Sequence, residues 1–325
     1  MTACMPDAGL SATGIGLPSS TGSRRIGWSA LPDEVTAGVQ TLLGAEVVAA
    51  ASQPGGFSEG LASLLTLADG RRVFVKAANS LTAPDVVRYH RREAAITPQL
   101  PATLAPRLLD VYDDGTWVAL ILEQIVGQLP AQPWRPDELD RVLAALTDLA
   151  RVLTPATVAA QLLAAPRLGG WSALAANDTA RARLPALSRW AADHLTDLIA
   201  LEALAPQALH GQTLLHGDLY PFNIMLTADR VTVIDWPHAW IGASHCDAVT
   251  LMSSASLSGV DPQQVAEHHP LTAAAQPQQI NVMLAMHAGF LLHNATTAEP
   301  DTDPNLLAMA VALGTASLRW LRQRL

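Results

Sequence analysis

The feature that most constrains this chain is the stretch from Leu214 to Trp236, in which polar residues punctuate short apolar runs. An apolar lead-in reaches Asp218, Asn223 follows five residues later, and Asp235 comes twelve residues after that, behind the apolar run 231–234. The pattern predicts a loop, a short strand, a turn and a second strand that ends in a carboxylate. Two carboxylates and an amide oxygen then converge, and such oxygen ligands are those that Mg²⁺ prefers, together with phosphates and waters.

Composition limits the class of protein. The chain has 325 residues and is 50% hydrophobic, which is ample for a buried core and for two lobes. Its formal net charge of −9 argues against a nucleic-acid partner and is compatible with a cationic substrate. The two cysteines, Cys4 and Cys246, cannot form a disulfide framework, so we expect a cytoplasmic protein.

We expect neither a signal peptide nor a membrane-spanning segment. The opening sequence MTACMPDAGLSATGIGLPSS lacks the basic and apolar regions of a signal peptide. The longest apolar run, Ile280 to Ala298, contains polar residues such as Asn281 and His287. We therefore expect a buried core helix there and no membrane partner.

Lysine usage singles out one position. Lys76 is the only lysine among the 20 basic residues. Because lysine offers a compact point charge whereas arginine is a wide planar fork, this position marks a place where arginine would not serve. Lys76 ends the second of two apolar runs, 61–67 and 72–76. The turn 68–70 lies between these runs, so they are predicted to form a hairpin.

The chain divides into three parts. Residues 1–25 are rich in Gly, Ser, Thr and Ala without periodicity, and we expect a disordered leader. Strand signals dominate residues 26–123, whereas helical signals dominate residues 124–325 after the Pro-rich connector 126–136. We therefore predict an α+β fold with a small β-rich N-terminal lobe and a larger, mainly helical C-terminal lobe, joined near Glu123.

Local patterns place the elements of these lobes. Beyond the connector, everything except Leu214–Trp236 is expected to be helical. The predicted helices are 31–43, Pro84 to Ala94 and 137–153, and the predicted strands are 47–51, 61–67, 72–76, 107–111 and 116–122.

The spacing His-x-Asp-x-x-x-x-Asn, followed by a strand-terminal Asp, is the phosphoryl-transfer pattern of the kinase fold. His216-Gly217-Asp218 stands where protein kinases have His-Arg-Asp, and Asp235-Trp236 where they have Asp-Phe-Gly. The chain thereby resembles the aminoglycoside phosphotransferase family and its choline-kinase-like relatives. Over residues 26–325 the resemblance implies a protein-kinase-like two-lobe fold that uses ATP and Mg²⁺.

The resemblance also implies roles within the opening stretch. Asp218 would orient the proton of an acceptor hydroxyl, while Asn223 and Asp235 would hold Mg²⁺ against the phosphates. His216 would brace the loop, and Asp247 would support it from the next helix. For Asp247 a helix N-cap is the local alternative.

Lys76 matches the strand lysine that contacts the nucleotide phosphates. Glu93, on the following helix, is its expected partner. The alternative for Glu93 is a surface pair with its neighbours Arg91 or Arg92, which would contribute little.

Two backbone segments complete the expected nucleotide site. A glycine loop would let backbone N–H groups approach phosphate, although Gly-Gly pairs are also ordinary turns; it comprises Gly55, Gly56, Phe57 and Ser58. At the junction of the lobes, backbone groups of Glu123 and Ile125 would meet the adenine edge, and such a hinge could also read GTP.

The acceptor is less constrained. Between Arg230 and Arg319 the chain has carboxylates but no Lys or Arg, which suits a polycation such as an aminoglycoside. Equally, these carboxylates could cap helices, as Asp303 would before the helix 306–313. The chain closes with the basic SLRWLRQRL, whereas aminoglycoside-modifying members often have an acidic-aromatic ending.

We therefore expect an enzyme, an ATP- and Mg²⁺-dependent O-phosphotransferase that modifies a hydroxyl of a small, hydroxylated and possibly cationic molecule. An aminoglycoside or related antibiotic comes first, followed by a metabolic amino alcohol or sugar (choline- or fructosamine-like). A catalytically silent nucleotide-binding module is the alternative, which the presence of Lys76, Asp218, Asn223 and Asp235 disfavours.

Overall fold

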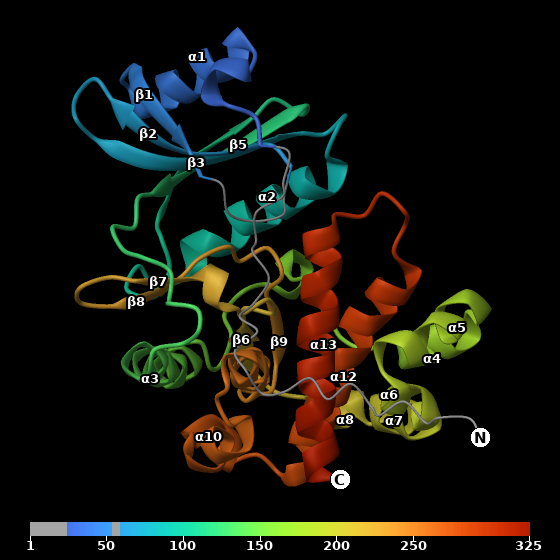
Figure 1. Ribbon diagram of the computed structural model, residues 1–325. Helices are drawn as coiled ribbons and strands as arrows, with labels where there is room; N and C mark the ends of the chain where they lie inside the picture. The colour runs from blue at the N-terminus through green and yellow to red at the C-terminus, as the bar shows by residue number, and fades with distance from the viewer. Residues whose placement is uncertain (1–24, 54–58) are drawn as a thin grey trace.

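The computed structural model describes residues 25–53 and 59–325, so nearly all of the predicted leader 1–25 and the whole glycine loop 55–58 lie outside the described residues. The described chain folds into two lobes, a β-rich one and, beneath it, a larger one that is mainly helical (Figure 1). The predicted α+β class is confirmed.

The N-terminal lobe is built on a five-stranded antiparallel sheet with the order β1-β2-β3-β5-β4. The predicted hairpin is formed by β2 and β3, with Leu65 opposite Val73. The strands are β1 (Val47–Ser52), β2 (Leu61–Leu67), β3 (Arg72–Asn79), β4 (Leu108–Asp113) and β5 (Trp117–Glu123).

A helix covers each face of this sheet (Figure 1). Ile121 of β5 packs with α1 (Asp33–Leu43) on the outer face, and its neighbour Leu120 packs with α2 (Pro84–Ile96) on the face toward the other lobe. Because successive side chains of a strand point to opposite faces, a strand buried on both sides is apolar throughout. This explains the unbroken apolar run of β5.

The same alternation in β3 buries Ala77 against α1 and turns Lys76 toward α2. The sequence interpretation ended this strand at Lys76, which is wrong. The strand continues to Asn79, because Ala77 and Asn79 still pair with β5. Alanine is a weak strand former, so the pattern conceals the extension.

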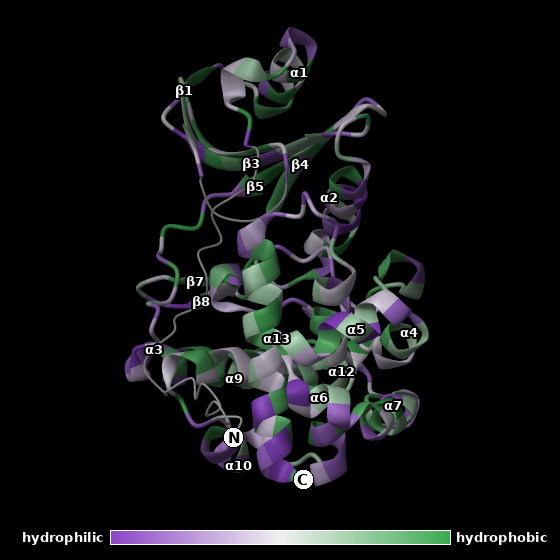
Figure 2. Cartoon of the chain, turned by 45° about the vertical axis from the view of Figure 1, so that its right-hand side comes forward, coloured by the Kyte–Doolittle hydropathy of each residue, from purple (hydrophilic) through white to green (hydrophobic). Residues whose placement is uncertain are grey.

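The C-terminal lobe is built around α12 (Pro277–Thr297), which packs against α13 (Pro304–Arg324) and α9 (Cys246–Ala255). Its side chains are buried along most of its length, as the apolar run Ile280–Ala298 predicts for a core helix. In Figure 2 the packed middle of this lobe is mostly green, and the C-terminal end of α13 is purple. None of the helices in the described part of the chain has the length and apolar character of a membrane span.

The remaining helices surround this core. They are α3 (Pro136–Val152), α4 (Trp171–Ala176), α5 (Asp178–Leu187), α6 (Arg189–Asp193), α7 (Leu195–Ala203), α8 (Ala205–Ala208), α10 (Pro262–His268) and α11 (Pro270–Ala273).

Two short two-stranded sheets interrupt the helices. The strands β7 (Ile224–Leu226) and β8 (Val231–Val233) form the predicted hairpin ahead of Asp235. The strand β6 (Thr213–Leu215) pairs with β9 (Trp240–Gly242), a region that we expected to be helical. That expectation is wrong, because a three-residue strand is too short to display a period of its own.

Candidate functional site

A cleft with a volume of about 1240 Å³ lies between the two lobes. Its upper lining comes from β2, β3 and α2, and its lower lining from the segment 217–240 and from α12 and α13. The polar residues that the sequence singles out meet here, from elements of both lobes: Lys76, Glu93, Asp218, Asn223 and Asp235.

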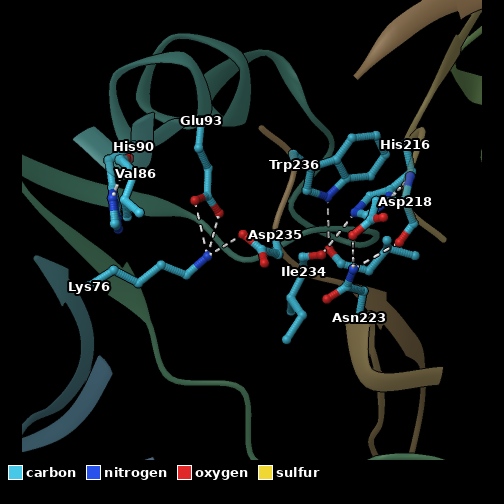
Figure 3. A network of polar contacts seen from close by, with 11 residues as sticks. Lys76, Val86, His90, Glu93, His216, Asp218, Asn223, Ile234, Asp235 and Trp236 are labelled. Carbon is cyan, nitrogen blue, oxygen red and sulfur yellow. Dashed lines mark hydrogen bonds and ion pairs between the residues drawn. The ribbon is translucent and has the colours of Figure 1, made fainter. Parts of the chain in front are cut away.

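Lys76 is held between two carboxylates (Figure 3). Its Nζ lies 3.0 Å from both Oε1 and Oε2 of Glu93 and 2.8 Å from Oδ1 of Asp235. The side chain of Glu93 is only 4% exposed, whereas that of Asp235 is 43% exposed. Glu93 therefore anchors the lysine from behind, and Asp235 meets it from the open side of the cleft.

The three charges control one another. Burial would lower the pKa of Lys76, but Asp235 and Glu93 outweigh it and raise that pKa above its ordinary value. Burial would likewise raise the pKa of Asp235, but Lys76 outweighs it and lowers that pKa to about 2. For Glu93, burial prevails over the attraction of Lys76 and raises its pKa.

The surface-pair alternative for Glu93 does not describe this structure. Arg91 points away and pairs with Asp113, with Nε 2.8 Å from Oδ2. Arg92 donates instead to the backbone carbonyl of Pro237 at 3.3 Å. Glu93 pairs with Lys76 because α2 lies under the face of the sheet to which Lys76 points.

His216 fixes the backbone ahead of Asp235. Its Nε2 donates to the carbonyl of Ile234 at 2.9 Å, while its Nδ1 accepts from the N–H of Asp218 at 3.3 Å. One neutral tautomer satisfies both contacts. The ring also meets Trp236 edge-on, with the centroids 4.8 Å apart. His216 thus couples the loop of Asp218 to the turn of Asp235.

Asp235 has φ 68°, a left-handed conformation that few non-glycine residues adopt. Such backbone strain persists where the surroundings enforce it, and it concentrates at functional sites. Gly217 also has positive φ, 78°, and a Cβ there would meet the carbonyl of His238 at 2.4 Å. The close approach of these two segments explains why the loop has Gly217 between His216 and Asp218.

Asp247 lies in the first turn of α9 and is buried. Its carboxylate accepts from the backbone N–H groups of His216 at 2.7 Å and Gly217 at 3.1 Å. Burial raises the pKa of Asp247, while these two donors favour its charged form. The N-cap position belongs to His245, so the alternative of Asp247 as the helix N-cap is wrong.

Asp218 is held from two sides. The amide Nδ2 of Asn223 donates to its backbone carbonyl at 2.8 Å and reaches its Oδ2 at 3.3 Å. On the other side, Nη1 of Arg167 lies 3.1 Å from its Oδ1. The carboxylate remains 21% exposed to the cleft.

No sequence signal identified Arg167, which lies in the loop before α4 (Trp171–Ala176). Two backbone contacts hold this loop against other parts of the lobe. Ala164 donates to the carbonyl of Ala239 at 2.9 Å, and Gly169 to that of Met286 at 2.7 Å.

The carboxylate of Glu202 holds the C-terminal end of the loop that carries Arg167. Glu202 of α7 accepts from the backbone N–H groups of Gly170, Trp171 (3.0 Å) and Ser172 (2.8 Å). The guanidinium of Arg167 is thus presented to Asp218 by a loop that is fixed at both ends.

At the junction of the lobes, the backbone N–H of Glu123 donates to the carbonyl of Arg107 at 2.9 Å. Its side chain pairs with Arg107 and Arg230, at 3.1 Å and 3.6 Å. The N–H of Glu123 is therefore not available for an adenine edge. Ile125 lies beyond the end of β5 and lines the cleft.

The oxygen ligands predicted for Mg²⁺ are compatible with that ion. Because Nδ2 of Asn223 is engaged by Asp218, its amide oxygen is turned to the side of Asp235 (Figure 3). An amide oxygen and a half-exposed carboxylate suit a hard divalent cation. The described residues contain no cluster of three or more His, Cys, Asp or Glu side chains that could hold a metal. The remaining ligands would therefore come from water and phosphate.

Two of the carboxylates beyond Arg230 serve as helix caps, whereas Asp235 and Asp247 belong to the cleft. Asp261 accepts from the N–H of Gln263 at the start of α10, and Asp303 accepts from that of Asn305 at the start of α13. Of the described residues that line the cleft, none is Asp261, Glu267, Glu299, Asp301 or Asp303.

A family model described as "Phosphotransferase enzyme family" matches residues 54–279. No curated protein matches the chain in sequence.

Solved structures share its fold at low identity. A choline kinase from Cryptosporidium parvum Iowa II aligns with a TM-score of 0.56 at 9% identity, covering 92% of this chain and 93% of that one. A choline/ethanolamine kinase family protein from Mesorhizobium loti gives 0.56 at 17%, covering 90% and 99%. A macrolide 2'-phosphotransferase from Brachybacterium faecium gives 0.50 at 18%, covering 87% and 98%. The predicted kinase-like fold is confirmed.

Proposed function

Because this chain belongs to the phosphotransferase enzyme family, we propose that it is an ATP- and Mg²⁺-dependent kinase that phosphorylates a hydroxyl of a small molecule. One observation carries the proposal. Lys76, paired with both Glu93 and Asp235, shares a cleft with Asp218 and Asn223, and these charges come from both lobes. Phosphoryl transfer needs positioned charges more than covalent chemistry, and this cleft supplies them.

In the reaction, the acceptor oxygen bonds to the γ-phosphorus, the bond from that phosphorus to the β,γ-bridging oxygen breaks, and ADP leaves. Asp218 accepts the hydroxyl proton and aims the oxygen. Lys76 neutralises phosphate charge, and Asn223 and Asp235 would hold Mg²⁺. When bound, the ion neutralises negative charge on the phosphates.

We propose that the acceptor belongs to one of four classes of small molecule: aminoglycosides, choline, ethanolamine or macrolides. The sequence favours an aminoglycoside. Of the carboxylates beyond Arg230 that suggested a polycation site, however, only Asp235 and Asp247 line the cleft, and they are already engaged by Lys76 and by the backbone of the catalytic loop. The structural relatives are described as kinases of choline or ethanolamine and as a macrolide phosphotransferase. All four classes should be tested together in one panel of candidate acceptors.

The test is transfer of phosphate with a matched control. The protein is incubated with ATP, Mg²⁺ and each panel member, and products are read by mass. Asp218→Asn should lower turnover by orders of magnitude, since it removes the proton acceptor. Asp178→Asn makes the same chemical change at a side chain that is 89% exposed in α5, and should leave turnover unchanged.

A catalytically silent module predicts a different result. Such a protein would bind ATP, with weaker binding in Lys76→Ala, yet no panel member would gain a phosphoryl group. Equal turnover in wild type and Asp218→Asn would remove Asp218 from the mechanism.

A further inference from the structure

The half of the cleft below the catalytic carboxylate has an apolar wall. It is formed by the segment after Asp218, by α12 and by the N-terminal half of α13, in which green turns follow a pale purple first turn in Figure 2. We call the following six residues the apolar wall: Phe222, Phe290, Leu291, Leu306, Leu307 and Leu313.

The wall is anchored from behind and open in front. Leu291 and Leu313 are buried with Tyr220 in a cluster of their own. Leu306, by contrast, is 41% exposed at the cleft. An exposed leucine in a concave site, which it lines together with leucines of a buried apolar cluster, indicates a surface that a ligand covers.

The wall adjoins the catalytic carboxylate through Arg167. The ring of Phe290 lies 5.0 Å from Cζ of Arg167, whose Nη1 is 3.1 Å from Asp218. Tyr220 is fixed beside Phe222, because its hydroxyl lies 2.7 Å from Nε2 of His287. A molecule lying on the wall would therefore bring its edge to Asp218.

The charges around the wall disfavour a cation. Arg167 is the basic group at its border with the catalytic site, and its pairing with Asp218 neutralises the nearest carboxylate. Within the described lining of the cleft, α12 and α13 contribute no Asp or Glu. A polycation lying on this wall would thus meet apolar side chains and a guanidinium, because neither helix supplies a carboxylate to pair with it.

We infer that the acceptor is an uncharged, hydroxylated molecule with an extended apolar body, which lies on the apolar wall and presents a hydroxyl to Asp218. The inference rests on the proposed kinase function and names the substrate class of the same site. Apolar contact supplies the binding. Asn294 and Thr302, which also line the cleft, are among the polar side chains that can orient the molecule.

The test separates the apolar body from the hydroxyl. Glucose, hexyl glucoside, octyl glucoside and the aminoglycoside kanamycin are titrated by calorimetry into the protein loaded with Mg²⁺ and a non-hydrolysable ATP analogue. Affinity should rise with alkyl length, by about fourfold for each buried methylene. The heat-capacity change should become more negative along the series, as apolar burial requires. Kanamycin should show no saturable binding.

A pair of variants locates the site. Leu306→Glu puts a carboxylate on the wall and should weaken octyl glucoside about tenfold while leaving the affinity for the ATP analogue unchanged. Leu81→Glu makes the same change at a leucine that is 83% exposed outside the cleft, and should have no effect.

Four outcomes overturn the inference. Saturable binding of kanamycin without binding of the alkyl glucosides would reverse the substrate class, and equal affinities in both variants would place the alkyl chain elsewhere. If the ATP analogue binds with Mg²⁺ while no glucoside does, the inference fails and the kinase function stands. If the nucleotide does not bind either, both fail together.

Discussion

Arg167 places Nη1 3.1 Å from Oδ1 of Asp218, although no motif links the two residues and 51 positions separate them. On the other oxygen of the same carboxylate, Asn223 lies 3.3 Å away. A carboxylate held at both oxygens has one orientation, so Arg167 acts as a positioning residue for the proposed base. Its guanidinium also covers Phe290 at the border of the acceptor half.

We expect Arg167→Ala to lower kcat by about 10- to 100-fold, because a loosened base no longer aims the acceptor oxygen. The KM for ATP should stay unchanged, since Arg167 contacts neither Lys76 nor Asp235. Steady-state kinetics with the acceptor found by mass would measure both. Arg189→Ala, at an arginine 82% exposed, is the control. A shift in the KM for ATP with kcat intact would contradict the positioning role.

Glu202 should influence catalysis without touching the cleft. Its carboxylate accepts from the backbone N–H groups of Gly170, Trp171 and Ser172, which end the loop of Arg167. We expect Glu202→Ala to cost about 1–3 kcal/mol in the free energy of unfolding, because these donors lose a charged acceptor. Urea melts would measure this loss.

The same Glu202 variant should also lower kcat, by releasing Arg167. Combining Glu202→Ala with Arg167→Ala should then lower kcat no further than Arg167→Ala alone. Additive losses would show that Glu202 acts on turnover by another route.

The variant Lys76→Arg tests whether arginine can replace the single lysine. The ammonium group of Lys76 fits between Glu93 and Asp235 at 3.0 Å and 2.8 Å, with only 16% of the side chain exposed. A planar guanidinium is wider, so Lys76→Arg should displace Asp235 and lower kcat/KM for ATP by ~100-fold. The reverse exchange Arg72→Lys, at an exposed position of the same strand, should leave it unchanged. If Lys76→Arg had the kinetics of the wild type, the site would not require lysine, and the presence of the single lysine at this position would be due to chance.

The sequence made the charged centre predictable because strand and loop patterns carry it. Two-residue alternation in β3 turns Lys76 to the face that α2 covers, and the spacing from Asp218 to Asp235 fits a loop and a hairpin. Arg167 has no such pattern, since its position depends on contacts of its loop with Ala239, Met286 and Glu202. These contacts are distant in sequence and are made largely through backbone atoms, so side-chain identity does not reveal them.

The class of substrate could not be predicted from the charges in the sequence for a related reason. The sequence correctly shows that carboxylates are present beyond Arg230, but it does not show where their side chains point. Asp261 and Asp303 turn to the starts of their own helices. The lower lining of the cleft includes leucines of α13 such as Leu306, whose helical spacing in sequence is that of any core-facing helix.

Three buried histidines give the stability of the fold a predictable pH dependence. Burial lowers the pKa of His90 to about 3, and that of His245 and His287 to about 4. In the unfolded chain each has the ordinary value near 6.5. Between about pH 6.5 and pH 4 the unfolded state therefore binds more protons than the folded state, and stability falls as the pH falls. Each histidine contributes up to ~1.4 kcal/mol per pH unit in that window.

Urea melts at several pH values between 7 and 4.5 would measure this slope. His287 isolates it best, because its ring lies between the hydroxyls of Tyr220 and Ser317, each at 2.7 Å. Asp218 and Arg167 are the charges that act on it, with opposite signs. His287→Asn should reduce the slope, whereas His268→Asn, at an exposed histidine of α10, should preserve it. The raised pKa values of Glu93 and Asp247 act in the opposite direction and are common to both variants, so equal slopes would show that His287 does not stay neutral in the fold.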